Sequence, residues 1–343
     1  MTNASIVLVT GATGGVGRSV CAALLREGIG VRVLLMPEDD SAGLKLPNEA
    51  IFRGLVEDPA SVESAVDGVE GVIHCAAILP NRPGVSAARY LLVNRGGTEN
   101  VLNAALKRQL KTAIFFSTIS VVDHNSKVIN RDRVCEYVTG ATDPYLVSKI
   151  AAEQSVVAAR SKFGGQLAII RPGFVYGPKA LGVWGEPLRL ASQGKMFLIG
   201  GGRAALPLAY AEDIAAYIVA LLRGNNRHEA PYDIHVVANP EPTTIAEVFT
   251  FVCEYLGARR PRSIARSPLA LAAGICDLLP RSMRLGPLGM LTQARVRQYS
   301  MGYDLSGLLD HPVLSQIRMT SYRVGLSRML DEYIATHGRS QSQ

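Results

Sequence analysis

The stretch that most restricts the fold stands near the start of the chain, where the apolar run SIVLVTG (5–11) leads into ATGGVG and a helical pattern. Gly11, Gly14 and Gly17 have the spacing GxxGxxG. Such glycines allow a tight turn, a close approach of the backbone to a pyrophosphate and packing of the helix on the strand. The helix N-terminus then offers its unpaired N–H groups to the phosphates. In its place between a strand and a helix, the motif predicts a dinucleotide-binding unit.

Strands and helices alternate beyond this motif. Short apolar runs predict strands, and helical spacing predicts the helices between them. The strands are 5–11, 31–36, 71–77, 112–118 and 167–173, and the helices are 16–28, 58–68, 87–109 and one that contains PYLVSKIAAE (144–153). The order favours a Rossmann-type doubly wound parallel sheet with right-handed crossovers. The pattern changes near Tyr176, so we expect a nucleotide-binding domain over 1–175 and a smaller, interleaved α/β substrate lobe over 176–343.

Charge is concentrated in one segment. The chain carries 36 Lys and Arg against 29 Asp and Glu, a net charge of +7. Between Gly257 and Ser300 lie eight arginines and a single acid, Asp277, so this segment accounts for the whole imbalance. It contains one aromatic residue, Tyr299, which argues against nucleic-acid binding. A solvated surface, a phosphorylated substrate and peripheral contact with anionic lipid remain the alternatives.

Cysteines and histidines give no sign of a disulfide frame or a metal site. The five cysteines show no CxxC spacing, and the six histidines are scattered. Reduced thiols and the absence of a basic leader before Ser5 predict a cytoplasmic protein without a metal. The apolar stretch LALAAGICDLL (269–279) is too short to span a bilayer.

The pair Tyr145 and Lys149 stands four residues apart in PYLVSKIAAE, so both side chains lie on one helical face. Alone, such a pair is ordinary helix surface. Its setting changes the interpretation, because seven motifs occur in the order seen in the extended short-chain dehydrogenase/reductases. They are TGATGGVG, VIHCAA, VNRGGTENVLNAA, FFSTIS, PYLVSKIAAE, IIRPGFVYGP and PLAYAEDIA.

The chain therefore resembles the NAD-dependent epimerase/dehydratase family, and within it the branch similar to 3β-hydroxysteroid dehydrogenase and dihydroflavonol reductase. The resemblance implies that Tyr145 is the general acid/base at the reacting carbonyl or alcohol. A free phenol has a pKa of about 10, so an ammonium one turn away must favour its anion. Lys149 has that role and also binds the ribose. Thr118 is expected to hold the substrate oxygen, with Ser117 and Ser120 as alternative alignments.

The resemblance also implies cofactor-binding positions. The phosphate loop supplies Gly11, Thr13, Gly14, Gly15, Val16 and Gly17. Ala76 and Ala77 should pass beneath the cofactor, and Asn94 should lie near the nicotinamide ribose. Pro172, Phe174 and Val175 should border the nicotinamide. Tyr145 and Lys149 contact the cofactor as well.

The adenosine end departs from the family pattern. Leu35 stands where NAD-using relatives have an Asp, Met36 where NADP-using relatives often have an Arg, and Leu55, followed by Val56, where the family has a second Asp. The acids at 38–40 would repel a 2′-phosphate, which favours NAD over NADP.

Members of this family catalyse dehydration, epimerisation or net oxidation and reduction, and the residues of this chain favour the last. A 4,6-dehydratase is excluded, because Thr118-Ile119-Ser120 lacks the acids that drive water loss. Leu206 stands where epimerases have an arginine that grips the nucleotide diphosphate. We therefore expect an NAD(P)-dependent oxidoreductase acting on a secondary alcohol or ketone of a hydrophobic, steroid-, flavonoid- or polyketide-like substrate. A nucleotide-sugar 4-epimerase, or related sugar-nucleotide reductase, with retained NAD is the alternative, and a catalytically silent cofactor-sensing protein is a third class. Relatives often pair through the Tyr/Lys helix, so a homodimer is expected.

Overall fold

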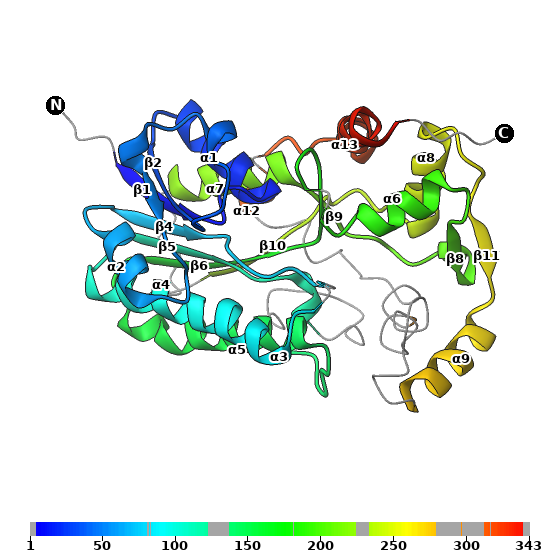
Figure 1. The fold of residues 1–343 in the computed structure, drawn as a ribbon, viewed down its shortest axis with the longest axis horizontal. Helices are drawn as coiled ribbons and strands as arrows, with labels where there is room; N and C mark the ends of the chain where they lie inside the picture. Colours follow the sequence, from blue (N-terminus) through cyan, green and yellow to red (C-terminus); the bar gives the residue numbers. More distant parts are fainter. Residues whose placement is uncertain are drawn as a thin grey trace.

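The centre of the molecule is a seven-stranded parallel sheet (Figure 1). The computed structural model describes residues 5–80, 82, 84–122, 137–180, 182–223, 233–278, 296, 312–315 and 317–338. The strand order is β10-β6-β5-β4-β1-β2-β3. The strands are β1 (Ile6–Thr10), β2 (Gly30–Leu35), β3 (Ile51–Arg53), β4 (Gly71–His74), β5 (Thr112–Phe116), β6 (Gln166–Pro172) and β10 (Asp233–Val237). The predicted doubly wound parallel sheet is confirmed.

Helices cover both faces of this sheet, which is why its strands are apolar on both sides. In β1, Val7 and Val9 pack into the cluster beneath α1 (Gly15–Arg26) and α7 (Ala211–Arg223), whereas Leu8 packs into the opposite cluster. That second cluster lies beneath α2 (Pro59–Val66), α4 (Gly97–Lys107) and α5 (Pro144–Ala159). Figure 1 shows the two helical layers on either side of the strands.

Helix ends follow the local sequence. The Asp58 carboxylate caps α2 by accepting hydrogen bonds from the N–H groups of Ala60 (3.2 Å) and Ser61 (3.1 Å), and Pro59 occupies the first helical position. Asp143 caps α5 in the same way, by accepting from the N–H of Leu146 at 3.0 Å. This cap fixes where α5 begins and therefore sets the position of the residues in its first turns.

The predicted helix 87–109 is interrupted. It consists of α3 (Ala87–Tyr90), a π-helical segment η3 (Leu91–Gly96) and α4. A π-helical turn inserts one extra residue and rotates the following helix, and such turns are frequent at functional sites. Asn94 lies within this segment and is buried.

The described residues of the second unit form two short parallel strand pairs and four helices. The strands are β7 (Phe174–Tyr176) with β9 (Leu208–Tyr210), and β8 (Phe197–Ile199) with β11 (Arg262–Ile264). The helices are α6 (Gly185–Ser192), α8 (Ile245–Tyr255), α9 (Arg266–Leu278) and α13 (Tyr322–His337). Trp184, Phe249 and Leu326 belong to their shared core. β10 is a strand of the main sheet and α7 packs against that sheet, although both follow residue 176 in the chain. The two units are therefore interleaved in sequence. The boundary at 175/176 stays a prediction.

Short elements complete the described chain. They are α12 (Pro312–Ser315) and the one-turn 3₁₀ helices η1 (Ala42–Leu44), η2 (Asn48–Ala50), η4 (Ile119–Val121), η6 (Arg160–Lys162) and η7 (Gly200–Gly202). Four of the cysteines (21, 75, 253 and 276) are unpaired thiols. The described residues form no group of acids, histidines and cysteines that could hold a metal, and none of the described helices is long and apolar enough to cross a membrane.

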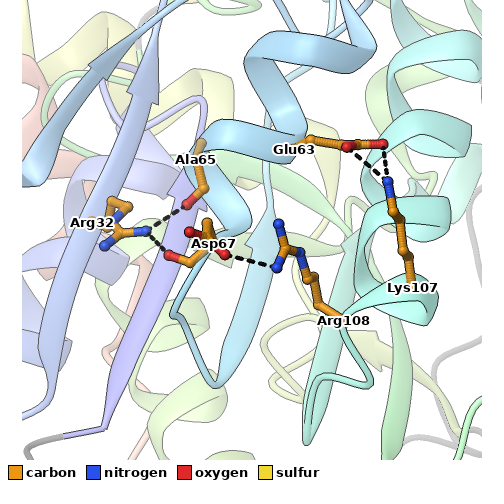
Figure 2. Close-up of polar contacts among 6 residues, drawn as sticks. All are labelled: Arg32, Glu63, Ala65, Asp67, Lys107 and Arg108. Carbon is orange, nitrogen blue, oxygen red and sulfur yellow. Dashed lines mark hydrogen bonds and ion pairs between the residues drawn. The ribbon is translucent and has the colours of Figure 1, made fainter.

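Polar contacts join β2, α2 and α4 at the amino-terminal edge of the sheet (Figure 2). The Arg32 guanidinium donates to the carbonyl oxygen of Ala65 at 3.0 Å and also to that of Asp67, and the Asp67 carboxylate pairs with Arg108 at 2.8 Å. Arg32 also lies over the ring of Phe52, 4.7 Å from its centroid. Arg32 is thus engaged at the opposite edge from the carboxyl ends of the strands, where a dinucleotide binds in this kind of sheet.

The described part of the arginine-rich segment is highly exposed. Arg259, Arg260, Arg262 and Arg266 are exposed, and Arg260 pairs with Glu254 at 2.6 Å. On α9, Leu271 is 70% and Ile275 58% exposed. Most of the remaining segment, 279–295 and 297–300, lies outside the described residues, and lipid contact stays a prediction.

Candidate active site

The turn between β1 and α1 forms a backbone cradle that only glycine can make. Gly11 has a φ of +67°, and a Cβ on it would lie 2.7 Å from the backbone nitrogen of Ala76. A Cβ on Gly17 would lie 2.2 Å from the carbonyl oxygen of Gly11. Gly14 begins α1 without a side-chain cap, so the first N–H groups of the helix are left for a ligand. The cradle therefore fits a dinucleotide pyrophosphate.

The other predicted loop residues have distinct surroundings. The Thr13 hydroxyl donates to the Asp39 carboxylate at 3.2 Å. A Cβ on Gly15 would lie 2.7 Å from the Cβ of Ala180, so the chain that follows β7 covers this side of the loop. Val16 packs against the core beneath α1.

A carboxylate stands at the carboxyl end of β2 although the usual strand-end Asp is missing. Leu35 is buried in the core, whereas Met36 is 45% exposed. The Asp39 carboxylate accepts hydrogen bonds from the N–H of Met36 at 3.3 Å and from the Thr13 hydroxyl. Arg53 holds this turn by donating to the carbonyl oxygens of Met36 (3.0 Å) and Asp39 (2.6 Å). Among the three acids noted in the sequence, Asp39 is therefore the one that reaches the phosphate loop.

The residues predicted to lie on the adenine side, Leu55 and Val56, are apolar and at least partly buried. Val56 is buried, and its carbonyl oxygen accepts from the Asn100 side chain at 3.0 Å. A Cβ on Gly97 would lie 2.7 Å from a methyl group of Val56, so α4 packs directly on this residue. Leu55 beside it is partly buried.

Residues after β4 are held by side chains from β1 and from the π-helical segment η3. The N–H of Ala76 donates to the Thr10 hydroxyl at 3.2 Å, and Ala77 follows it with partial exposure. The Asn94 amide accepts from the N–H of Ile78 (2.7 Å) and donates to the Ile78 carbonyl (3.1 Å) and the Ser148 hydroxyl (2.9 Å). Asn94 thus braces the chain after β4 against α5, and its predicted place beside the nicotinamide ribose stays a prediction.

Tyr145 and Thr118 meet at the carboxyl end of β5. Desolvation raises the pKa of Tyr145 to about 12, and a hydrogen bond with Thr118 opposes this by stabilising the phenolate. The ring of Tyr90 lies edge-on to Tyr145, with 6.3 Å between the ring centroids. The Ser117 hydroxyl is buried without a partner among the described residues. Of the three hydroxyls left open by the sequence, Thr118 is therefore the one in contact with Tyr145.

Lys149 is one turn further along α5 and is 5% exposed. Its ammonium donates to the carbonyl oxygen of Phe116. Burial lowers the pKa of Lys149 to about 8, and the negative charge of Glu153 partly offsets that effect. At neutral pH the side chain is therefore mostly cationic, and the predicted effect of its charge on the Tyr145 phenol stays a prediction.

Pro172, Phe174 and Val175 lie where β6 passes into β7. Pro172 ends β6 and is buried. The N–H of Phe174 donates to the carbonyl oxygen of Pro207 at 2.6 Å, and the Val175 carbonyl accepts from the Trp184 indole at 2.8 Å. The carboxyl ends of β1, β4, β5 and β6 thereby bring the predicted cofactor and catalytic positions to one edge of the sheet. Sequence reasoning missed a buried ion pair behind them, Glu153 with Arg171, although Glu153 stands four residues after Lys149.

This layout, a glycine cradle on a Rossmann-type sheet with a Tyr/Lys pair at the same edge, defines an NAD(P)-dependent enzyme. Residues 7–236 match the NAD dependent epimerase/dehydratase family, and the chain belongs to that family. This confirms the predicted membership of the extended short-chain dehydrogenase/reductases.

Relatives and solved structures agree with this assignment. The chain is 28% identical over 272 residues to 3 beta-hydroxysteroid dehydrogenase/Delta 5-->4-isomerase of Mycobacterium tuberculosis, covering 76% of this chain and 72% of that protein. It is 27% identical over 286 residues to 2-alkyl-3-oxoalkanoate reductase of Stenotrophomonas maltophilia, covering 81% and 84%. The Thermus thermophilus UDP-glucose 4-epimerase in complex with NAD shares the fold, with a TM-score of 0.67, 21% identity and coverage of 96% and 98%.

Proposed function

We propose that this enzyme interconverts a secondary alcohol and a ketone on a hydrophobic substrate, with Tyr145 as the general acid/base. The observation that carries the proposal is the contact of Tyr145 with Thr118, with the Lys149 ammonium one turn away on the same helix. The three groups supply a proton, a second hydroxyl for the substrate oxygen and a fixed positive charge. Their arrangement supports proton transfer at a carbonyl oxygen.

Each residue would have a separate role in this reaction. The glycine cradle would hold NAD(P)H, and the cofactor when bound would supply the hydride for the carbonyl carbon. The Tyr145 hydroxyl donates its proton to the carbonyl oxygen, and the resulting phenolate is stabilised by the Thr118 hydroxyl and by Lys149. In the direction of oxidation the Tyr145 phenolate takes the proton from the alcohol. Tyr90, edge-on to Tyr145, limits the positions that the phenol ring can adopt.

Apolar surroundings support a hydrophobic substrate. Leu79 and Val183 are 40% and 37% exposed. Leu79 follows the Asn94-braced chain, and a Cβ on Gly182 would lie 3.2 Å from a methyl group of Leu79, so these two segments face each other. Tyr90 joins this surface to the catalytic residues, because its hydroxyl donates to the Leu79 carbonyl at 3.0 Å. Such exposed apolar side chains beside the reacting groups suit a greasy ligand better than a sugar nucleotide.

Leu206 gives a second reason to prefer that substrate class. It is 5% exposed and packs in the core shared by α6, α8 and α13. A buried leucine there cannot grip a diphosphate. The exposed Arg203 is three residues away, so the nucleotide-sugar epimerase remains as the alternative, and the named relatives include dehydrogenases and reductases of apolar substrates.

The test compares Tyr145→Phe with wild type on a 3β-hydroxysteroid and on a 2-alkyl-3-oxoalkanoate. We expect at least a ~100-fold loss of kcat with the dissociation constant of NADH unchanged, because only the proton donor is removed. Tyr255→Phe is the control, since its hydroxyl binds Asp331 at 2.7 Å in the second unit. Full activity of Tyr145→Phe would disprove the catalytic assignment. Near-stoichiometric NAD released on denaturation, seen by mass spectrometry, would instead favour the epimerase.

A further inference from the structure

A fully buried ion pair lies behind the Tyr/Lys face of α5. Glu153 and Arg171 have side-chain exposures of 1% and 0%. The Arg171 Nε donates to both carboxylate oxygens of Glu153, at 3.1 and 3.2 Å, and its Nη2 donates to one of them as well. The Tyr137 hydroxyl also donates to Glu153 at 3.2 Å. The carboxylate is therefore fixed in one orientation by partners from β6 and from the chain before α5.

Stability alone does not account for this pair. Removing two charges from water costs several kcal/mol per ion, and apolar residues of similar volume often stabilise a protein as well or better. Apolar side chains such as leucine and methionine could thus pack between α5 and β6, often with no loss of stability. The charges therefore call for another explanation, which their neighbour on α5 supplies.

Lys149 is that neighbour. Glu153 follows it by one turn on the same helical face, and both side chains line a small cavity between α5 and β5 together with Thr98 and Ser117. Of the charges in the described part of the chain, that of Glu153 acts most strongly to keep Lys149 protonated, against the larger effect of burial.

Among the described residues, the other titratable groups that act on Lys149 bring no negative charge. His74, at the end of β4, is buried with a strongly lowered pKa and is neutral. Burial raises the pKa of the Cys75 thiol, which is neutral as well. Tyr145, on α5, is protonated at rest, and Arg171 adds a positive charge behind Glu153.

We propose that Glu153 is a positioning residue that keeps Lys149 in its cationic form, and that Arg171 and Tyr137 hold the Glu153 carboxylate in place beside the cavity that it shares with Lys149. The three charges alternate from β6 into the active site: Arg171 positive, Glu153 negative, Lys149 positive. Without Glu153 the buried lysine would lose its proton more readily, because the nearby negative charge that favours the ammonium would be gone. This inference rests on the proposed function of Tyr145 and Lys149.

The direct test is the titration of Lys149 in the full-length protein saturated with NADH. The chain has eight lysines, so the resonance of Lys149 in protein with isotope-labelled lysine can be assigned by its loss in Lys149→Arg. In Glu153→Gln, which keeps the size and hydrogen-bonding capacity of the side chain, we expect the titration midpoint to fall by about one pH unit or more. Glu153→Asp, which keeps the charge, should restore most of the wild-type midpoint.

Two further variants separate charge from folding. Glu153→Met with Arg171→Met removes the pair without leaving an unpaired buried charge, so it should fold even if Glu153→Gln does not. Its midpoint should also fall, but by less, because the opposing charge of Arg171 leaves too. Glu63→Gln is the control, since it breaks the exposed pair with Lys107, whose side-chain exposures are 46% and 61%.

We expect the same variants to change the pH dependence of kcat. The alkaline limb of the kcat profile should move to lower pH with Lys149, whereas a purely structural role would lower kcat by the same factor at every pH. A wild-type midpoint in the double methionine variant would overturn the proposal, as would an equal shift in Glu63→Gln. Because the midpoint is measured without turnover, it remains informative even if Tyr145→Phe shows that the proposed reaction is wrong.

Discussion

Acid should destabilise this protein through one histidine, His74, which ends β4 and is 2% exposed. The Thr10 hydroxyl contacts its Nδ1 at 2.8 Å, while its Nε2 has no partner among the described residues. Since the same hydroxyl oxygen accepts from the N–H of Ala76, its proton is available to His74 Nδ1. The neutral ring fits this arrangement, whereas the imidazolium would need acceptors at both nitrogens.

The magnitude follows from the two pKa values. Burial, with a smaller contribution from the Lys149 charge, lowers the pKa of His74 from 6.5 to about 3. The unfolded chain binds a proton below pH 6.5 and the folded chain does not, so stability falls as the pH falls through this window. Linkage over these values gives a loss of about 2 kcal/mol between about pH 7.5 and about pH 5.

Urea unfolding at a series of pH values measures this directly. His74→Gln lowers the absolute stability but removes the titrating group, so its free energy of unfolding should fall less steeply than that of wild type over the same range. His337→Gln, at an exposed position on α13, is the matched control for the loss of a histidine elsewhere in the fold. Parallel curves for wild type and His74→Gln would show that the ring titrates alike in the folded and unfolded chain, and the reasoning would be wrong.

Two other predictions concern cofactor choice and assembly. Asp39→Asn should improve binding of NADPH relative to NADH by about tenfold, because it removes a negative charge beside the predicted site of a 2′-phosphate. Fluorescence titration with each cofactor measures this ratio. Asp40→Asn is the control and should leave the ratio unchanged, because the Asp40 carboxylate accepts from the N–H of Ala42 at 2.9 Å instead. A homodimer through the Tyr/Lys helix would cover Leu91, Leu92 and Val147, which are 37%, 50% and 36% exposed. Leu92→Glu should then give a monomer in analytical ultracentrifugation, with Leu25→Glu on α1 as the control, and a wild-type monomer would contradict the dimer.

The main sheet could be predicted from sequence because its determinants are local. Val7–Val9 and the run ending at His74 are apolar on both faces, which marks buried parallel strands, and the glycines at 11, 14 and 17 have a spacing that few other structures need. Two strands of the main sheet escaped prediction. Ile51–Arg53 of β3 is too short a pattern, and β10 (Asp233–Val237) lies in the part of the chain that was assigned to the substrate lobe. The π-helical segment escaped too, because one extra residue hardly disturbs the apolar spacing on which a helix prediction depends.

Parts of the site that depend on tertiary contacts could not be read from sequence. Three adjacent acids follow β2, and only the fold shows that Asp39 turns back to Met36 and Thr13. Arg171 lies in an apolar strand, and no pattern in the sequence indicates that Glu153 is its partner. The Tyr145 and Lys149 pair was found through resemblance, since the spacing by itself describes any helix face.

The late position of β10 in the chain has a consequence for how the protein is made. β10 (Asp233–Val237) is hydrogen-bonded to β6 and closes one edge of the nucleotide-binding sheet. During synthesis every other strand of that sheet leaves the ribosome earlier, and the open edge of β6 waits while β7, α6, β8, β9 and α7 are translated. An unpaired strand edge is a site for mispairing between nascent chains. A fragment ending at 175 would leave that edge of β6 unpaired for good, so we expect the cofactor-binding unit to associate through this edge when it is produced alone.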